Sequence, residues 1–504
     1  MERSSMSRLA RGAFGALVIV HWLAAAAVAD LRGEVEVAIK RAPLAGGTVA
    51  VSIRDAETGA ALVSFKADEL LIPASNMKLL TTGAALHVLG ADFKFKTRLL
   101  RDGDRLIIVG DGDPGFGDPD LLKLMQLKGQ QGIDIETFID IWVQAVVDSG
   151  MSSVSEVVVD DRIFDRQFVH PAWPIDQLNR RYCAEVSGFS FHLNILHFYP
   201  RPGLGERPQL KLFQPYVEWL HPMNRATTRK GAHDRNDVWI ARKHNTNVLT
   251  FYGNVKHAYR APVPVTTHDM PAFFARLFAE RLAKAGVEVE GFRVAESGDP
   301  AASGELVGPI IGTPISTVVT RCNRQSQNLY AESLIKRLAF TLTNEPGSWI
   351  NGSAVVRNVV YERLNNPKLA AKIIVSDGSG LSRENRIAAE TLTAWLNTFH
   401  HDERIGPMFI DSLAHAGQSG TLANRFSTAD LYGATVQAKS GYIKYVSCLS
   451  GYITMPDGRR RSFSILANEL RQPGTVSKAK KMQERIVSLI AWDMSAVTSQ
   501  LGSD

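Results

Sequence analysis

Apolar and polar residues alternate in five stretches near the two ends of the chain. Residues 48–65, TVAVSIRDAETGAALVSF, alternate on both sides of Thr58-Gly59, a pattern typical of a β-hairpin. Residues 95–113 alternate in the same way around Asp102-Gly103. Three later stretches, ATVQAKSGYI, CLSGYITM and RRSFSILANE, predict strands at residues 434–443, 448–455 and 460–469. Strands are therefore expected both early and late in the chain.

Apolar residues recur with a helical period between these strands. After Ser75 they fall at Met77, Leu79, Leu80, Ala84, Leu86 and Leu89, and Gly90 ends the run. The same spacing predicts helices at 326–340, 388–401 and 477–494, and at 135–150 and 270–286 in a middle region rich in short strands, Pro and aromatic residues. Early and late strands with helices between them predict an α+β fold with an antiparallel sheet, made from both ends of the chain. The middle region is then an insertion.

The first residues have the pattern of an export signal. Arg3, Arg8 and Arg11 precede the apolar run AFGALVIVHWLAAAAVA, which closes on small residues before Asp30. We expect residues 1–29 to be a signal peptide cleaved near Ala29, which would make the protein periplasmic or otherwise exported. The alternative is a membrane anchor. No later stretch reaches the roughly 20 apolar residues that a spanning helix needs, so at most peripheral membrane contact is expected.

Composition and charge exclude several classes of protein. The 504 residues allow two or three domains, and a hydrophobic content of 45% with 21% charged residues argues against wholesale disorder. The formal net charge is +6, but the basic residues are scattered, so no nucleic-acid partner is expected. Cys183, Cys322 and Cys448 lack the CxxC spacing of a metal cluster, and whether any two of them pair is left open.

Ser75 and Lys78 could form a nucleophile and its base. Positions i and i+3 lie on one face of a helix, so the amine can reach the hydroxyl, and a lysine with a lowered pKa can take its proton. The alternative is that Ser75 caps the helix and Lys78 is solvated. SxxK also occurs at Ser333/Lys336 and Ser477/Lys480, so the motif alone is weak evidence.

Two further motifs strengthen the catalytic interpretation. Lys439, Ser440 and Gly441 lie on an expected strand, where a cation and a hydroxyl could bind a substrate carboxylate and a glycine could admit the substrate backbone. Ser326 and Asn328, one residue apart, could relay a proton and hold a substrate amide. Taken separately, Lys439 could equally be a charged residue on an edge strand, Gly441 a loosely packed glycine and Ser326 a helix cap.

The order of the three motifs is more specific than any one of them. SxxK, SxN and K(S/T)G occur in this order in penicillin-binding proteins and serine β-lactamases. The chain resembles, in particular, the D-alanyl-D-alanine carboxypeptidase/endopeptidase family, the low-molecular-mass class C penicillin-binding proteins. The blocks that carry the resemblance are LLIPASNMKLLTTGAALHVLG, LIIVGDGDPGF, SQNLYAESLIK, VSDGSGLSRENR, GQSGTLANRF and AKSGYIKYVSCLSGYI. The 251 positions between Ser75 and Ser326 fit the large insertion of this branch.

The resemblance implies an architecture. A penicillin-binding, transpeptidase-like domain is expected at residues 30–95 and 305–494, with helices flanking an antiparallel sheet. An inserted, strand-rich accessory region is expected at 96–304, as two nested small domains, the second at about 120–187. Residues 495–504 would be a tail. The resemblance implies neither a cofactor nor a metal; GDGDPGFGD, at residues 110–118, has close carboxylates but lacks the later Glu of an EF-hand.

The resemblance also implies the chemistry. Ser75 would attack a D-alanyl peptide bond of a peptidoglycan stem peptide. Lys78 would be the base, with its pKa lowered by Lys439 and by a partly dry site. Ser326 would relay the proton to the leaving amine, Asn328 would hold the substrate amide and Lys78, and Lys439 and Ser440 would bind the terminal carboxylate. The backbone N–H groups of Ser75 and Tyr442 would form the oxyanion hole, and β-lactams would acylate Ser75.

The sequence departs from the family pattern at two positions and is compatible with two other functions. Ser440 stands where most relatives have Thr, and Ser419 where an acidic residue is frequent. The alternative functions are a related serine hydrolase, such as a β-lactamase or esterase, and a catalytically silent wall-binding protein. The sequence leaves open the balance of carboxypeptidase and endopeptidase activity, the stem-peptide chemistry and the oligomeric state.

Overall fold

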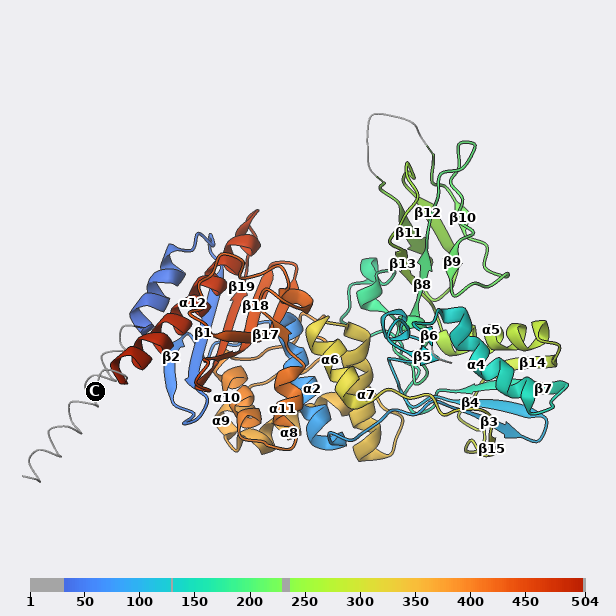
Figure 1. The fold of residues 1–504 in the computed structure, drawn as a ribbon, viewed down its shortest axis with the longest axis horizontal. Coiled ribbons are helices and arrows are strands. Elements are labelled where there is room, and N and C mark those ends of the chain that lie inside the picture. The colour runs from blue at the N-terminus through green and yellow to red at the C-terminus, as the bar shows by residue number, and fades with distance from the viewer. Residues whose placement is uncertain (1–30, 128–129, 229–235, 502–504) are drawn as a thin grey trace, which may run out of the picture.

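A six-stranded antiparallel sheet forms the centre of one half of the molecule in the computed structural model, which describes residues 31–127, 130–228 and 236–501 (Figure 1). The expected signal peptide lies outside the described residues. The strand order is β16-β17-β18-β19-β1-β2, with bounds β16 Ala414–His415, β17 Thr435–Ile443, β18 Val446–Thr454, β19 Arg460–Asn468, β1 Thr48–Asp55 and β2 Ala61–Phe65. Thr48 lies opposite Asn468, so the first strand of the chain pairs with the last. The predicted antiparallel sheet built from both chain ends is confirmed.

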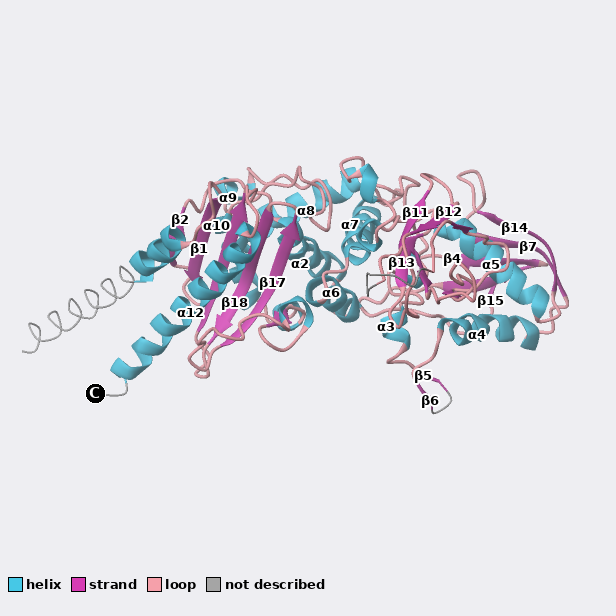
Figure 2. Cartoon of the chain, turned by 90° about the horizontal axis from the view of Figure 1, so that it is seen from above, coloured by secondary structure: helices cyan, strands magenta, loops and turns pink. Residues whose placement is uncertain are grey.

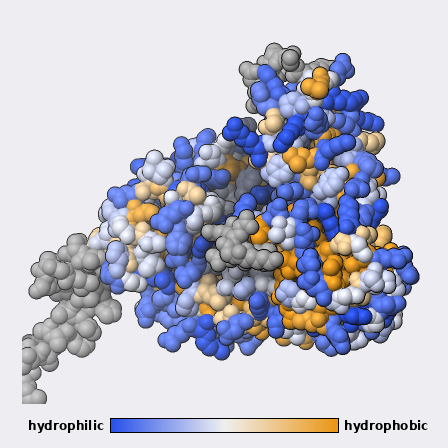
Figure 3. Space-filling view, turned by 45° about the vertical axis from the view of Figure 1, so that its right-hand side comes forward, coloured by the Kyte–Doolittle hydropathy of each residue, from blue (hydrophilic) through white to orange (hydrophobic). Residues whose placement is uncertain are grey.

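Helices cover both faces of this sheet (Figure 2). Helical residues 31–41 and α12 (Thr475–Leu501) pack on one face, where Leu31 and Val35 meet Ile486 and Ile490 in one apolar cluster with the strands. The other face is covered by α2 (Met77–Leu89), α6 (Ile315–Arg324), α7 (Asn328–Thr343), α8 (Trp349–Leu364), α9 (Pro367–Ala370), α10 (Ala389–His400) and α11 (Gly406–Asp411). Hydrophilic residues dominate the surface seen in Figure 3, as expected when the apolar faces meet inside.

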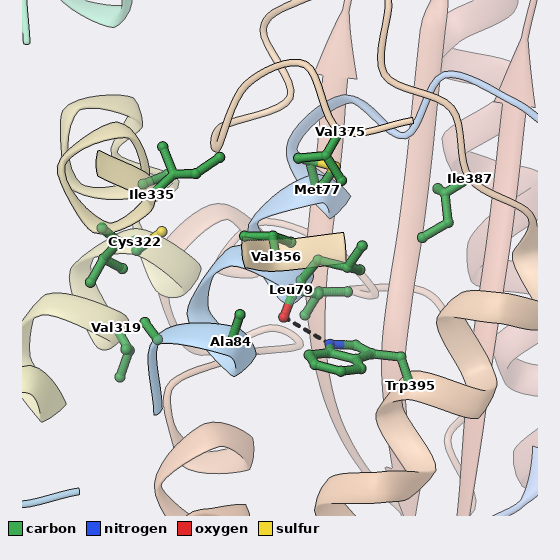
Figure 4. Packing of buried hydrophobic residues seen from close by; sticks show 14 of the residues in the cluster. Met77, Leu79, Ala84, Val319, Cys322, Ile335, Val356, Val375, Ile387 and Trp395 are labelled. Atoms are coloured by element: carbon green, nitrogen blue, oxygen red, sulfur yellow. Dashed lines mark hydrogen bonds between the residues drawn. The ribbon is translucent and has the colours of Figure 1, made fainter. Parts of the chain in front are cut away.

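The helix that follows Ser75 is buried on all sides. Residues Met77 to Leu86 of α2 are all buried, and neighbours from α6, α7 and α8 surround them (Figure 4). The Trp395 indole N–H, on α10, donates to the Leu79 carbonyl at 3.0 Å. A helix that is apolar all round needs such an enclosure. The start of α2, where Ser75 and Lys78 lie, is therefore fixed by packing from several directions.

A second, mixed sheet organises the inserted region. Its order is β14-β7-β4-β3-β15, with bounds β14 Glu288–Val294, β7 Ser153–Asp160, β4 Arg105–Val109, β3 Arg98–Asp102 and β15 Glu305–Leu306. Strands β4, β7 and β14 are parallel, and β3 and β15 are antiparallel to their neighbours. The helices α4 (Ile135–Asp148) and α5 (Met270–Lys284) share its apolar core, and α3 (Pro119–Leu122) precedes them.

The nested domain expected at about 120–187 stays a prediction. Strand β7 lies within that range and is an interior strand of the five-stranded sheet, between β14 and β4. The other strands of the inserted region form small sheets. One sheet consists of β8 Ile195–Phe198, β9 Phe213–Gln214 and β13 Val263–Thr266, and another of β10 Met223–Asn224, β11 Trp239–Arg242 and β12 Leu249–Tyr252. Strands β5 Gln126–Leu127 and β6 Gln130–Gln131 form a short pair. Pairing of β7 with strands distant in sequence cannot be read from local pattern. The outer limits of the insertion, 96–304, stay a prediction.

The carboxylates of the GDGDPGFGD segment tie the insertion to the helices beside the main sheet. Asp118 accepts hydrogen bonds from the Arg321 guanidinium at 2.6 Å and from the Tyr330 hydroxyl at 2.6 Å. Asp113 accepts from Thr313 at 2.8 Å. The Asp118 side chain is fully buried and that of Arg321 is 8% exposed. These residues act as a polar junction, and among the described residues no group of three or more metal-ligating side chains is present.

Asp118→Asn is expected to lower the free energy of unfolding by roughly 3 kcal/mol, because the buried guanidinium of Arg321 is then left with only the longer ion pair to the exposed Asp120 carboxylate. Urea denaturation of the purified protein measures this. Asp140→Asn, which removes an exposed carboxylate on α4, is the matched control and should change stability by less than about 0.5 kcal/mol. Equal midpoints for the two variants would contradict a stabilising junction.

Candidate active site

Ser75 lies in a tight turn just before α2. The 3₁₀ turn Ala74–Asn76 precedes the helix, and Ala74 has a left-handed φ of 47°. The N-cap of α2 is Asn76, and no side chain caps the helix. The alternative of Ser75 as a cap is therefore wrong, because the extra turn moves the helix start past it. The Ser75 hydroxyl instead accepts a hydrogen bond from Lys78 Nζ at 3.2 Å.

Lys78 is fully buried and uses all three of its hydrogen-bonding positions. Besides Ser75, its Nζ contacts Asn328 Oδ1 at 2.8 Å and the carbonyl oxygen of Ser379 at 2.8 Å. Burial lowers the pKa of Lys78, and the nearby acidic groups Cys322, Glu332 and Asp377 oppose that shift. A lysine held beside a serine with its pKa lowered can take up the hydroxyl proton.

Lys439 forms a second buried amine on β17. Its Nζ donates to Ser326 Oγ at 2.9 Å and to the Ser440 carbonyl at 2.9 Å. Burial, and then the charge of Lys78, hold the pKa of Lys439 well below its usual value. The resemblance implied that Lys439 and a partly dry site lower the pKa of Lys78. Burial is the largest cause of that shift in the structure, and the charge of Lys78 lowers the pKa of Lys439.

Ser326 and Asn328 are brought to the site by the turn between α6 and α7. Ser326 has a left-handed φ of 60°, a conformation that costs a non-glycine residue roughly 1–3 kcal/mol and is frequent at active sites. The N-cap of α7 is Gln327, so Ser326 is not the helix cap. Asn328 accepts from Lys78 through Oδ1 and donates through Nδ2 to the Tyr182 carbonyl of the insertion at 2.8 Å.

The three residues that follow Lys439 on β17 are Ser440, Gly441 and Tyr442, and they have different surroundings. The Ser440 hydroxyl donates to Thr421 Oγ1 at 2.8 Å, and Tyr442 is 60% exposed at the rim of the site. A Cβ on Gly441 would lie 2.7 Å from the carbonyl oxygen of Pro73. The glycine is thus required by the protein's own turn before Ser75, whereas the sequence suggested that it makes room for a substrate backbone.

A cleft of about 960 Å³ opens in front of these residues. Ser75, Ser326 and Asn328 line it, while the two lysines lie behind them. The opposite wall comes from the insertion, with Ala172, Pro174, Gln177 and Tyr182, and the rim from Gly380–Leu381, Arg383–Glu384, Tyr442–Tyr445 and Arg471. The structure therefore brings Ser75, Lys78, Ser326, Asn328, Lys439 and Ser440 into one site.

The loop at residues 376–385, SDGSGLSREN, was missed as part of this site. Its Ser379 carbonyl is a direct partner of Lys78. Gly380 has a φ of +81°, and a Cβ there would lie 1.8 Å from the carbonyl oxygen of Ala74, beside Ser75. The glycines were a signal of close backbone approach, but the sequence gave no reason to place this loop against Lys78.

The other two SxxK copies have different surroundings. Lys336 donates to Asp165 at 2.6 Å and to the Gln167 carbonyl at 2.8 Å, and both Ser477 and Lys480 are exposed on α12. We predict that neither copy has a catalytic role, and their surroundings favour this prediction. The three cysteines are buried and free, so none pairs with another. Within the described residues, no helix is long and apolar enough to cross a membrane.

A hydroxyl held by a buried lysine, a second buried lysine and a strand at the edge of a cleft define a serine-dependent acyl-transfer enzyme of the penicillin-binding type. The D-Ala-D-Ala carboxypeptidase 3 (S13) family matches residues 31–490. The chain belongs to this family, which confirms the resemblance seen in the sequence, and it is a serine-type DD-peptidase.

Individual relatives agree with this assignment. The D-alanyl-D-alanine carboxypeptidase of Actinomadura sp. (strain R39) is 32% identical over 88% of this chain and 82% of its own length. The D-alanyl-D-alanine carboxypeptidase DacB of Haemophilus influenzae is 22% identical over 86% of this chain and 88% of its own. The crystal structure of penicillin-binding protein 4 (dacB) from H. influenzae superposes with a TM-score of 0.70 at 19% identity, covering 91% of this chain and 99% of that chain, which shows a shared fold.

Proposed function

We propose that this enzyme cleaves D-alanyl peptide bonds of peptidoglycan through an acyl-enzyme on Ser75. The observation that carries the proposal is the contact of 3.2 Å between Ser75 Oγ, at the cleft wall, and the fully buried Nζ of Lys78. It suits both release of a terminal D-alanine and cleavage of a cross-link, because both reactions break a bond after a D-alanyl residue.

Acylation begins with the transfer of the Ser75 proton to Lys78. The oxygen attacks the carbonyl carbon of the D-alanyl bond, and the backbone N–H groups of Ser75 and Tyr442 stabilise the oxyanion, each donor contributing about 2.7–4 kcal/mol in comparable sites. As the C–N bond breaks, the Ser326 hydroxyl gives its proton to the leaving amine and receives in turn the proton that Lys78 took from Ser75, so Lys78 is neutral again before water enters. Lys439, 2.9 Å from Ser326 Oγ, supplies the positive charge beside this step.

Deacylation reverses the roles around the same atoms. Water loses a proton to Lys78 and attacks the ester carbon, the bond to Ser75 Oγ breaks, and Ser75 regains its proton. Asn328 holds Lys78 and the substrate amide throughout. Ser440 binds the carboxylate at the end of the substrate, in the positive field of Lys439. No metal or cofactor takes part in these steps.

β-Lactams should acylate the same serine. A related crystal structure is that of H. influenzae penicillin-binding protein 4 complexed with a β-lactam, with a TM-score of 0.64 at 21% identity. Opening the lactam ring breaks a C–N bond, but the amine stays attached to the acyl group, so we expect water to release the product slowly. We also propose that the enzyme acts outside the cytoplasmic membrane, in line with the N-terminal pattern of residues 1–29.

The test is to incubate the wild-type protein with benzylpenicillin, measure its intact mass and map the modified peptide. We expect one added penicillin on the peptide that contains Ser75, and release of D-alanine from a peptide ending in D-Ala-D-Ala. A modification elsewhere, or no modification, would overturn the proposal. Rapid turnover of penicillin without a stable adduct would instead favour a β-lactamase.

Thr421→Val should weaken the binding of substrates that end in a carboxylate. Ser440 lacks the β-methyl that restricts a threonine rotamer. When the Ser440 hydroxyl turns its proton to a substrate carboxylate, the Thr421 hydroxyl can donate to Ser440 Oγ and keep it oriented. Loss of a bond contributing about 0.5–1.5 kcal/mol should raise KM for a D-Ala-D-Ala peptide by roughly 3–10-fold, with kcat little changed. In the double variant Ser440→Thr/Thr421→Val, the branched side chain should restore much of the loss. An unchanged KM in Thr421→Val would exclude this role.

A further inference from the structure

A buried carboxylate on α7 holds the loop that contacts Lys78. Glu332 is fully buried, and its Oε2 accepts from the backbone N–H of Gly378 at 2.9 Å and from the Trp349 indole at 2.8 Å. Its Oε1 accepts from the backbone N–H of Ser379 at 2.8 Å. Three donors on two oxygens fix the direction of two successive peptide groups. Glu332 thus sets the orientation of the loop at Ser379.

That orientation places the Ser379 carbonyl within hydrogen-bond distance of the Lys78 amine. The Ser379 carbonyl accepts from Lys78 Nζ at 2.8 Å, and the carbonyl of the preceding residue, Gly378, accepts from Thr81 Oγ1 at 2.7 Å. Both Lys78 and Thr81 belong to α2. The loop is therefore held on one side by Glu332 and on the other by the helix of the nucleophile.

Glu332 and Asn328 share one face of α7. They are four residues apart, so their side chains lie one above the other. Asn328 contacts Lys78 directly, and Glu332 reaches it through Ser379. A single helix face thus controls two of the three partners of Lys78, the third being Ser75.

We propose that Glu332 is a positioning residue for acyl transfer, which orients the Ser379 carbonyl so that Lys78 is aimed at Ser75. The proposal rests on the function proposed above, because it concerns the base of that reaction. Glu332 has no place on the cleft wall and does not touch the reacting atoms. Its effect passes through the loop and through its charge.

The charged and titratable groups that face Lys78 come from four elements. They are Cys322 on α6, Glu332 on α7, Asp377 in the loop and Lys439 on β17. The negative charges of Glu332 and Asp377 raise the pKa of Lys78 against the larger effect of burial. Burial and Asp377 in turn raise the pKa of Glu332 to about 7, against its hydrogen bonds to Ser379, Trp349 and Gly378. Removing the Glu332 carboxylate should therefore lower the pKa of Lys78 further.

The sign of the pH effect follows from the role of Lys78. Acylation needs the neutral amine, so its rate rises with pH through the pKa of Lys78. A lower pKa moves this rising limb to lower pH. A residue that only stabilised the fold would change how much active enzyme is present and leave the limb in place.

The experiment compares wild type and Glu332→Gln by the second-order rate of labelling with a fluorescent penicillin, across a range of pH. A glutamine that accepts from Gly378 and Trp349 must turn its NH₂ group towards the Ser379 N–H, which displaces the carbonyl from Lys78. We expect the maximal rate to fall by roughly 10–100-fold, the cost of a misplacement of about 1 Å. The rising limb should move to lower pH.

Two further variants separate position from charge. Glu332→Asp keeps the charge but withdraws it from the loop, so the rate should fall while the limb stays near its wild-type pH; it also tests the positioning if Glu332→Gln fails to fold. Glu345→Gln removes an exposed carboxylate just after α7 and should change neither quantity. A Glu332→Gln protein with a wild-type limb, or a Glu332→Asp protein with a wild-type rate, would overturn the proposal. Absence of label on the wild type would instead refute the proposed function.

Discussion

Ser75→Ala is expected to abolish covalent labelling by a fluorescent penicillin and to slow the release of D-alanine by roughly 10⁴-fold or more. The oxygen that would form the ester is absent from the variant, so no acyl-enzyme can accumulate. The hydroxyl accepts a hydrogen bond from Lys78 and lies in a turn whose shape is set by neighbouring backbone. The fold should therefore survive the change. Gel fluorescence and peptide hydrolysis measure the two effects.

Ser477→Ala is the matched control. Ser477 starts the same four-residue motif with Lys480, but both side chains are exposed on α12. Labelling and hydrolysis should equal those of the wild type. Label that persists on Ser75→Ala, or that disappears from Ser477→Ala, would contradict the assignment of the nucleophile.

Lys78→Met is expected to slow acylation by about 10²–10⁴-fold, which is the usual contribution of a positioned general base. Methionine fills much of the space of the lysine but cannot accept the Ser75 proton. It also leaves Asn328 Oδ1 and the Ser379 carbonyl without their donor, so some stability is lost as well. Stopped-flow acylation, expressed per folded molecule, isolates the chemical step.

Lys336→Met provides a control with the same change at a buried site. Lys336 is also fully buried, and its partner is Asp165, so the variant should be destabilised in a similar way. Its acylation rate per folded molecule should nevertheless stay within a few-fold of the wild type. Equal slowing in both variants would show that loss of a buried lysine, and not loss of the base, explains the effect.

Much of the site could be predicted because its residues belong to short motifs in a fixed order. Ser75, Lys78, Ser326, Asn328, Lys439 and Ser440 do meet, although 364 positions separate Lys439 from Ser75. The strands of the main sheet were also predictable, because their apolar and polar residues alternate even though helices cover both faces of the sheet. Helix α8 was missed, because Gly352 and Ser353 interrupt its apolar spacing.

What the sequence could not provide is the direction of individual groups. Whether Gly441 faces substrate or the turn at Pro73 depends on which side of β17 packs against that turn. The role of Ser379 depends on a backbone carbonyl, which every residue possesses and which therefore leaves no mark in the sequence. Glu332 reads as an ordinary polar position of α7, and only its burial among three N–H donors distinguishes it.

The position of the nested sheets was beyond local pattern for a related reason. Alternation identifies β7 as a strand but says nothing of its partners, which are β4 on one side and β14, more than 120 residues later, on the other. Contacts of such long range are set by the whole chain.

The pairing of β1 with β19 has a consequence for the order in which this enzyme can be made. Thr48 meets Asn468, and Lys439 meets Ser326 only after β17 has been synthesised. The ribosome therefore synthesises the whole insertion, whose sheet has its last strand at residue 306, before Lys439 exists and the active site can form. Chains cut short before β17 would carry Ser75 but no second lysine beside Ser326. The topology thus confines peptide-cleaving activity to chains that extend past β17.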